Sequence, residues 1–219
     1  MSAEQTDIIT AIVLAAGSSS RLGQSKQLLQ VEGEPLIRRI ARISSESNAD
    51  RTLVVLGDNE REHGRVIRDL PLYICIHSGW EKGMGSSLKA GMDFIQSFLA
   101  DTTAIIVLVC DQPLLTTDHL NNLIDRYRST KAHVVASTYS GVMGVPVLFA
   151  ASLFAEIRRI DDNHGARQII DKHKAGAQRV EFPGGELDID TPEDYQRFKE
   201  SLRAQEDARI TQGFTTGQS

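Results

Sequence analysis

The 219-residue chain contains only two cysteines, Cys75 and Cys110, and both lie inside apolar runs. Two such cysteines do not make the disulfide framework of a small secreted domain, and neither is surrounded by the ligand spacing of a metal site. The longest continuous apolar run, 104–110, is far too short to span a bilayer. The amino terminus also lacks a basic segment followed by an apolar one. We therefore expect a cytoplasmic protein with reduced thiols and no membrane partner.

The chain also lacks an excess of basic charge, because 24 lysines and arginines stand against 29 aspartates and glutamates, a net charge of −5. Non-specific nucleic-acid binding depends on neutralising phosphates, so we expect no nucleic-acid partner. Hydrophobic residues make up 41% of the chain and charged residues 24%, which are ordinary values for a globular protein. This composition argues against disorder and against a fibrous repeat.

Strands and helices alternate along nearly the whole sequence. Apolar runs predict strands at 8–16, 52–57, 72–76, 104–110, 133–137, 145–149 and 179–182. Apolar spacing, caps and surface charge predict helices near 35–43, 60–70, 84–99, 117–127, 153–160, 166–173 and 192–203. Several strands are apolar throughout, which is typical of a parallel sheet with helices on both faces. We expect a doubly wound, mostly parallel α/β sheet in three α/β/α layers, forming a single domain over 7–205 with a flexible tail at 206–219.

A loop of small and polar residues follows the first predicted strand. Doubly wound sheets bind ligands beyond the carboxyl ends of their strands, so this loop is a candidate site. Gly17 and Gly23 let backbone N–H groups approach a phosphate closely, and Arg21 and Lys26 add two cations. The composition suits a triphosphate, although it matches neither common glycine-rich phosphate motif. A plain strand-to-helix turn with two solvated cations explains the composition equally well.

Carboxylates follow later in the chain. Asp111 stands at the end of the most apolar strand, where it suits Mg²⁺, which takes one or two carboxylates plus phosphate oxygens. The alternative is that this aspartate only makes a turn. In the segment 188–194, a helix cap explains most of the polar residues. It does not explain Asp188 and Asp190. One of these two is a candidate second metal ligand facing Asp111.

Three further segments contain residues that suit a ligand. The segment 79–91 has glycines and serines at a helix start, where exposed N–H groups hold a polar or anionic ligand, unless the glycines serve packing alone. The segment 141–149 is a glycine-containing loop that leads into a strand, and it is either an acceptor-binding wall or a turn. His164 and Arg167 lie near another predicted helix start, and a surface role is the simpler interpretation for them.

Together these stretches resemble the MobA-like family of nucleotidyltransferases, which have a Rossmann-like fold and couple a nucleoside triphosphate to a phosphorylated acceptor. The sequence LAAGSSSRLGQSK at 14–26 resembles the family's LAAGxSxRxGxxK loop, and Asp111 its metal-binding aspartate. The stretches GMGSSL, GVPVLF, HGAR and DIDTPEDY are similar to those of the molybdenum cofactor cytidylyltransferase branch. The resemblance extends over about 12–195.

The resemblance implies a role for each matching residue. Arg21, Lys26 and Asp111 would be catalytic, and Asp111 and Asp190 would hold Mg²⁺ as the cofactor. The nucleotide-binding residues would be Leu14, Ala15, Ala16, Gly17, Ser18, Ser19, Arg21, Gly23, Lys26, Gly83, Gly85, Ser86 and Ser87. The implied reaction is attack of the terminal phosphate of molybdopterin on the α-phosphorus of CTP, with release of pyrophosphate.

The implied partners are CTP, a phosphorylated pterin acceptor and, transiently, a molybdoenzyme or its maturation factor. Ala16 stands where the guanylyl branch usually has glycine, which favours cytosine as the base. Val145 stands where the family more often has a polar residue, which leaves the acceptor open. Two alternatives remain: transfer of guanylyl or another nucleotidyl group to molybdopterin or another small phosphorylated acceptor, and a non-catalytic cofactor-binding maturation protein. Pyrophosphate release would exclude the second.

Overall fold

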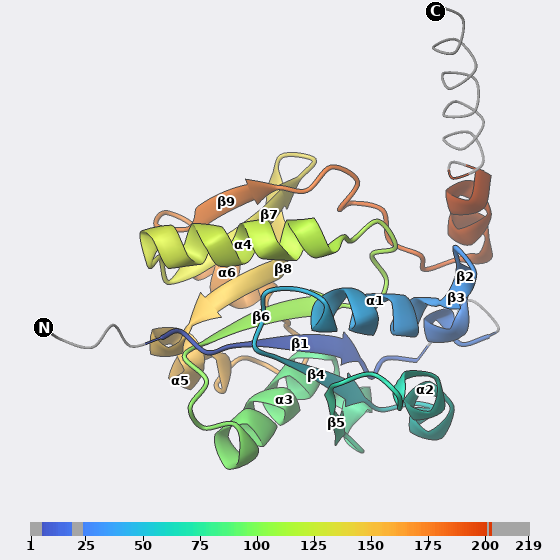
Figure 1. Cartoon of the computed structure of the whole chain (residues 1–219), viewed down its shortest axis with the longest axis horizontal. Coiled ribbons are helices and arrows are strands. Elements are labelled where there is room, and N and C mark those ends of the chain that lie inside the picture. Colours follow the sequence, from blue (N-terminus) through green and yellow to red (C-terminus); the bar gives the residue numbers. More distant parts are fainter. Residues whose placement is uncertain (1–5, 19–23, 201, 203–219) are drawn as a thin grey trace, which may run out of the picture.

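The computed structural model describes residues 6–18, 24–200 and 202. Its centre is a seven-stranded sheet with the strand order β5-β4-β1-β6-β8-β7-β9 (Figure 1). The strands are β1 (Ile9–Ala15), β4 (Arg51–Leu56), β5 (Tyr73–Ile76), β6 (Ala104–Val109), β7 (Val134–Tyr139), β8 (Val142–Ala150) and β9 (Gln178–Glu181). Neighbouring strands pair in parallel except where β8 pairs with β6 and β7. The mostly parallel sheet predicted from the sequence is confirmed.

Helices cover both faces of this sheet (Figure 1). One face carries α1 (Leu36–Ser45), α2 (Glu60–Ile67) and α4 (Thr117–Thr130), and the other carries α3 (Met84–Phe98), α5 (Phe154–Ile157) and α6 (Arg167–His173). In β1, Ala11 and Val13 pack in the first layer, whereas Ile12 and Leu14 pack in the second. Because successive strand residues point to opposite faces, a strand between two helical layers is apolar throughout. The three-layer α/β/α fold is therefore confirmed.

Short elements join the main ones. They are the 3-10 helices η1 (Lys26–Leu28), η2 (Trp80–Lys82) and η3 (Ala151–Leu153), and a small hairpin of β2 (Gln30–Val31) and β3 (Glu34–Pro35). A last helix covers 192–200. At its start, Thr191 N donates to Asp194 Oδ2 at 2.9 Å and Asp194 N donates to Thr191 Oγ1 at 3.1 Å. These reciprocal bonds confirm the predicted helix cap.

Strand β8 is longer than the strand predicted at 145–149, since it begins at Val142. Its pairing with β7 changes from Ser137–Gly144 to Ala136–Val147, which leaves Val145 and Pro146 in a bulge. Proline has no N–H to donate to a neighbouring strand, so a bulge is one of the few places inside a sheet that accepts it. The predicted turn is thus limited to Ser140 and Gly141, and the rest of the 141–149 segment is a bulged strand.

Among the described residues, no helix is both long enough and apolar enough to cross a bilayer. Both cysteines are free, with Cys110 buried and Cys75 partly buried. The tail predicted at 206–219 lies outside the described residues.

Candidate active site

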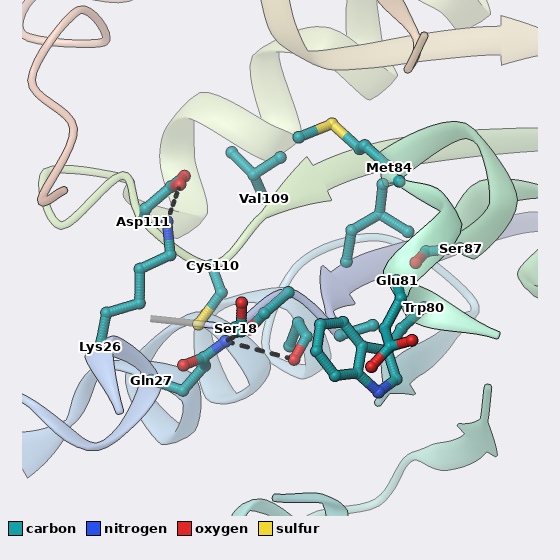
Figure 2. A pocket seen from close by; sticks show the side chains of 15 residues that line it. Ser18, Lys26, Gln27, Trp80, Glu81, Met84, Ser87, Val109, Cys110 and Asp111 are labelled. Carbon is teal, nitrogen blue, oxygen red and sulfur yellow. Dashed lines mark hydrogen bonds and ion pairs between the residues drawn. The ribbon is translucent and has the colours of Figure 1, made fainter. Parts of the chain in front are cut away.

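The carboxyl ends of four parallel strands lie side by side. The paired residues Leu14–Val109, Ala15–Leu56 and Leu56–Ile76 place the ends of β6, β1, β4 and β5 at one edge of the sheet. The loops that follow these strands therefore meet, and a cavity of about 290 Å³ opens between them. We call it the first cavity; it is lined by Leu14, Ala15, Ala16, Gly17, Ser18, Lys26, Gln27, Trp80, Glu81, Gly83, Met84, Ser87, Val109, Cys110 and Asp111 (Figure 2).

Most residues that the sequence analysis assigned to the nucleotide are in this lining. The exceptions fall into two groups. Ser19, Arg21 and Gly23 lie outside the described residues, and Gly85 and Ser86 are described but do not line the cavity.

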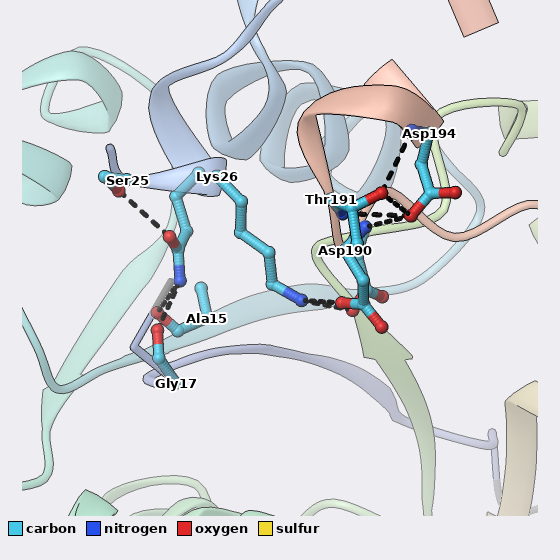
Figure 3. A network of polar contacts seen from close by, with 9 residues as sticks. Ala15, Gly17, Ser25, Lys26, Asp190, Thr191 and Asp194 are labelled. Atoms are coloured by element: carbon cyan, nitrogen blue, oxygen red, sulfur yellow. Dashed lines mark hydrogen bonds and ion pairs between the residues drawn. The ribbon is translucent and has the colours of Figure 1, made fainter. Parts of the chain in front are cut away.

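The charged end of the first cavity is formed by Lys26 and Asp111, and Asp190 contacts Lys26 beside it. Lys26 Nζ donates to Asp111 Oδ2 at 2.7 Å and to Asp190 Oδ1 at 3.1 Å (Figure 3). Burial lowers the pKa of Lys26, but the charges and hydrogen bonds of Asp111 and Asp190 outweigh burial and raise it well above its ordinary value. Lys26 is therefore a permanent cation at this edge of the sheet.

The buried Ile189 explains why distant aspartates meet here. Its side chain is fully buried, and its N–H donates to Asp111 O at 3.3 Å, which fixes the two flanking aspartates beside Asp111. Asp190 contacts Lys26, as described above. Burial, together with the charges of Asp111 and Asp190, raises the pKa of Asp188 to about 6. The structure thus brings Asp111 and Asp190 to one cation, Lys26, and their role as a metal pair stays a prediction.

The donor set suits a metal ion that arrives with a nucleotide. Within the described residues, no group of three or more His, Cys, Asp or Glu side chains is arranged to hold a metal ion. Two carboxylates do not form a cage by themselves, but Mg²⁺ usually takes one or two carboxylates and completes its shell with water and phosphate oxygens. Asp111 and Asp190 fit that role, because both already face a shared positive charge.

The opposite end of the first cavity is formed by Trp80, Glu81 and Ser87, across from Lys26 and Asp111 (Figure 2). Trp80 packs against the end of β4. A Cβ on Gly57 would lie 2.7 Å from both Ala16 O and Trp80 Cβ, distances that a real side chain does not tolerate. Glycine at 57 is therefore needed for the indole to reach the strand end. The sequence analysis marked this loop but not Trp80, although it is the single tryptophan of the chain.

Gly85 and Ser86 have a packing role, which differs from the nucleotide contact predicted for them. A Cβ on Gly85 would overlap the carbonyl oxygens of Asp161 and His164, so the start of α3 lies directly against that loop. The Ser86 hydroxyl donates to Gly83 O at 2.7 Å. These contacts fix the position of the loop before α3, on the side that faces away from the first cavity.

A buried network supports the first loop. Gln27 Nε2 donates to Gly17 O at 2.7 Å, and Ser25 Oγ donates to Gln27 Oε1 at 2.9 Å (Figure 3). His63 Nε2 lies 2.7 Å from Ser25 Oγ, and because Ser25 uses its hydrogen on Gln27, His63 is the donor. Burial lowers the pKa of His63, which favours this neutral form. The network ties the first loop to α2.

A second cavity of about 250 Å³ adjoins the first and shares Met84, Val109 and Asp111 with it. Its remaining lining residues are Gln112, Tyr139, Val142, Met143, Gly144, Val145, Gly165, Ala166, Arg167, Ile170 and Asp188. The 141–149 and 162–168 segments thus reach the same cavity. The sequence analysis did not mark Gln112 or Tyr139, because neither has a signal in the sequence apart from its neighbours.

This sheet, with its loops and charged groups at one edge, defines a Rossmann-like nucleotidyltransferase fold. A family model described as the MobA-like NTP transferase domain matches residues 11–177, and the chain belongs to that family.

Known relatives and structures agree with this assignment. The purine catabolism protein PucB of Bacillus subtilis is 31% identical over 206 residues, which cover 87% of this chain and 96% of PucB. A molybdenum cofactor guanylyltransferase of Rhodobacter capsulatus is 28% identical over 201 residues, 89% of this chain and 97% of the relative. The crystal structure of an Rv0371c homologue from a Mycobacterium species has a TM-score of 0.76 at 27% identity, covering 90% of this chain and 97% of its own. Rv0371c of Mycobacterium tuberculosis, solved in complex with manganese, has a TM-score of 0.71 at 23% identity and covers 88% and 98%.

Proposed function

We propose that this protein transfers CMP from CTP to the terminal phosphate of molybdopterin and releases pyrophosphate, with residues 7–205 acting as one catalytic domain. The observation that carries the proposal is the pair of cavities that meet at Asp111, which Lys26 holds by an ion pair of 2.7 Å. A nucleotide in the first cavity and an acceptor in the second would bring their phosphates to this charged junction.

The chemistry of such a transfer needs no protein nucleophile. A phosphate oxygen of the acceptor forms a bond to the α-phosphorus, and the bond from that phosphorus to the β-phosphate oxygen breaks, so that its electron pair leaves with pyrophosphate. Positioning and neutralisation of charge provide most of the rate enhancement in reactions of this kind. Cys110 lines the first cavity, but burial raises the pKa of its thiol and keeps it neutral.

In this proposal the cations neutralise phosphate charge, and the carboxylates hold the metal ion. Lys26, together with Arg21, would neutralise triphosphate oxygens and the leaving pyrophosphate. Asp111 and Asp190 would hold the divalent cation, Mg²⁺ in this proposal, which supplies Lewis-acid neutralisation of phosphate charge when it is bound. The manganese in the Rv0371c structure supports a divalent cation in this fold.

The base in this proposal is cytosine. The methyl group of Ala16, which is buried in the lining, narrows the cavity relative to a glycine and disfavours a purine. The Ser87 hydroxyl lies at the end away from Lys26, and Gly83 lines the same cavity; in this proposal both would meet the polar edge of the base. Guanylyl transfer is the second candidate, favoured by the similarity to the molybdenum cofactor guanylyltransferase.

The proposal is tested by pyrophosphate release from each of the four ribonucleoside triphosphates in the presence of Mg²⁺ and molybdopterin. We expect CTP to react fastest. Equal or faster turnover of GTP would overturn the choice of cytosine, but the proposed nucleotidyl transfer would still stand. Binding of nucleotide without any pyrophosphate release would instead identify a non-catalytic cofactor-binding protein.

A further inference from the structure

Among the described residues, the large hydrophobic side chains that are strongly exposed are Tyr73, Ile76, Met84, Phe98 and Val142. Met84 and Val142 line the two cavities, so the candidate active site accounts for them. Tyr73, Ile76 and Phe98 are 44%, 56% and 70% exposed, and they lie outside both linings. Apolar exposure of this kind, when it gathers in one place, marks an interaction surface.

The three remaining side chains gather at one edge of the sheet. Tyr73 and Ile76 belong to β5, the last strand on that side, and α3 packs against it (Figure 1). The ring of Phe94 in α3 joins the other two rings, since its centroid lies 6.2 Å from that of Tyr73 and 4.8 Å from that of Phe98. We call Tyr73, Ile76, Phe94 and Phe98 the edge patch.

The backbone of β5 is unpaired on its outer side. Within the described part of the chain, β5 pairs with β4 alone, so its outward N–H and C=O groups remain available to another strand. The opposite edge strand, β9, is equally short but carries two exposed charged residues, Arg179 and Glu181. Charged side chains protect an edge strand from pairing with other chains. β5 contains no charged residue and lacks this protection.

A second copy of this chain satisfies the edge of β5. Two copies related by a twofold axis perpendicular to the sheet would pair their β5 strands antiparallel and keep each face of the sheet on its own side. Residues that lie opposite each other must then point to the same face, so a centred pairing puts either Ile74 or Cys75 on the axis. Ile76 lies opposite Leu72 or Ile74 of the other copy, which is an apolar contact in either register.

Helix α2 has charges that suit the same arrangement. Asp69, just after α2, pairs with Arg38 of α1, and α1 lies over β1 and β4. Helical spacing places Glu60 and Arg68 on the other side of α2, towards the outer edge of the sheet. Glu60 is the first residue of α2, and Arg68 is its carboxyl-terminal cap. A twofold axis exchanges the two ends, so Glu60 of each copy would face Arg68 of the other.

We propose that this protein forms a twofold dimer in which the β5 strands of two copies pair antiparallel and continue the sheet, while each copy covers the edge patch of the other. The inference goes beyond the proposed function and does not rest on it, because neither cavity enters the argument. Loss of pyrophosphate release would therefore leave it standing.

Sedimentation velocity over a concentration series tests the dimer. Ile76→Lys puts a charge against an apolar residue of the other copy, and we expect the Kd of the dimer to rise at least about tenfold. Phe98→Lys, at the most exposed position of the edge patch, should act in the same direction with little cost to folding. Gln178→Lys adds the same charge to β9 and is the matched control. A wild type that stays monomeric throughout, or a dimer that neither β5-side variant weakens, would overturn the inference.

A charge exchange tests the antiparallel arrangement. Glu60→Lys and Arg68→Glu should each weaken the dimer, and the double variant should recover most of the wild-type affinity. Both changes oppose the dipole of α2, so damage to the helix would add up in the double variant instead of cancelling. A double variant that dimerises no better than either single variant would overturn the proposed pairing.

Discussion

The two cavities share a wall, but their charged groups have opposite surroundings. In the first cavity Lys26 is held by Asp111 and Asp190, so an incoming triphosphate must exchange with contacts that already exist. In the second cavity burial, together with the charges of Asp111 and Asp190, raises the pKa of Asp188 to about 6. The cation of the first cavity is therefore compensated before a nucleotide arrives, whereas a carboxylate of the second cavity lies beside like charges.

Asp111→Asn should have the largest effect, because Asp111 belongs to both cavities. The variant removes the negative charge that holds Lys26 and would hold the divalent cation. We expect pyrophosphate release to fall on the order of 10²- to 10³-fold, with an unchanged circular dichroism spectrum. Asp93→Asn, at an exposed position of α3, is the matched control. A folded Asp111→Asn protein with near-normal turnover would show that the cavities do not meet at a catalytic carboxylate.

Acid should act on the second cavity through His119. Its Nε2 lies 2.7 Å from Ser137 Oγ, which donates to Pro146 O in the β8 bulge at 2.6 Å. Burial lowers the pKa of His119 to about 4. In the unfolded chain histidine binds a proton near pH 6.5, so the unfolded state holds more protons between these two values. The contribution of neutral His119 is therefore present above pH 6.5 and lost as the pH falls towards 4, on the order of 3 kcal/mol of unfolding free energy.

This pH dependence is measured by urea unfolding of wild type and His119→Gln at pH 7 and pH 4. The glutamine keeps a donor for Ser137 but does not titrate, so the difference between the two proteins isolates His119 from the carboxylates. Wild type should lose more stability in acid than the variant does. Parallel losses in the two proteins would show that His119 does not titrate as described.

Lys26→Ala should weaken nucleotide binding in the first cavity and leave binding in the second cavity unchanged. The variant removes a cation that would contact triphosphate oxygens, so we expect the Kd for CTP, measured by Trp80 fluorescence, to rise about tenfold. Added salt should weaken CTP binding by wild type more than by the variant. Lys174→Ala, at an exposed site far along the chain, serves as the control. If Lys26→Ala and Arg21→Ala both keep normal affinity and rate, the first loop is a turn with solvated cations.

Ala16→Gly should have the smallest effect, and it should change only the preference of the enzyme for one base over another. Removing one buried methyl group widens the first cavity, and we expect kcat/KM for GTP relative to CTP to rise about fivefold. The measurement compares the two nucleotides in one reaction with molybdopterin. A ratio that stays constant would remove Ala16 from the residues that select cytosine.

The sequence predicted the sheet because each strand has a local signal. Residues 104–110 are apolar without interruption, and they form β6 between two helical layers. Since parallel strands place their carboxyl ends together, the same signals predicted the first loop and Asp111 at one edge of the sheet. The ion pair that joins Lys26 to Asp111 was not predicted.

The features that the sequence did not predict depend on contacts between segments that are distant in the chain. The bulge at Val145 and Pro146 exists only in the register between β8 and β7. The place of Trp80 depends on Gly57, and the orientation of the Gln112 amide depends on Gly185. Single residues whose neighbours come from other strands have no period or motif that marks them. The hairpin at 30–35 was missed for a related reason, since its two-residue strands are too short to show alternation.

The bulge in β8 has an evolutionary consequence. The first cavity is built from loops beyond strand ends, where insertions and deletions alter the shape of a site without disturbing the sheet. The second cavity takes Val142–Val145 from inside a seven-stranded sheet, where a change of length would shift the register of β8 against both neighbours. Descendants of this chain would therefore acquire new acceptors by exchanging single side chains around the bulge, and lineages with different acceptors would keep the same length of β8.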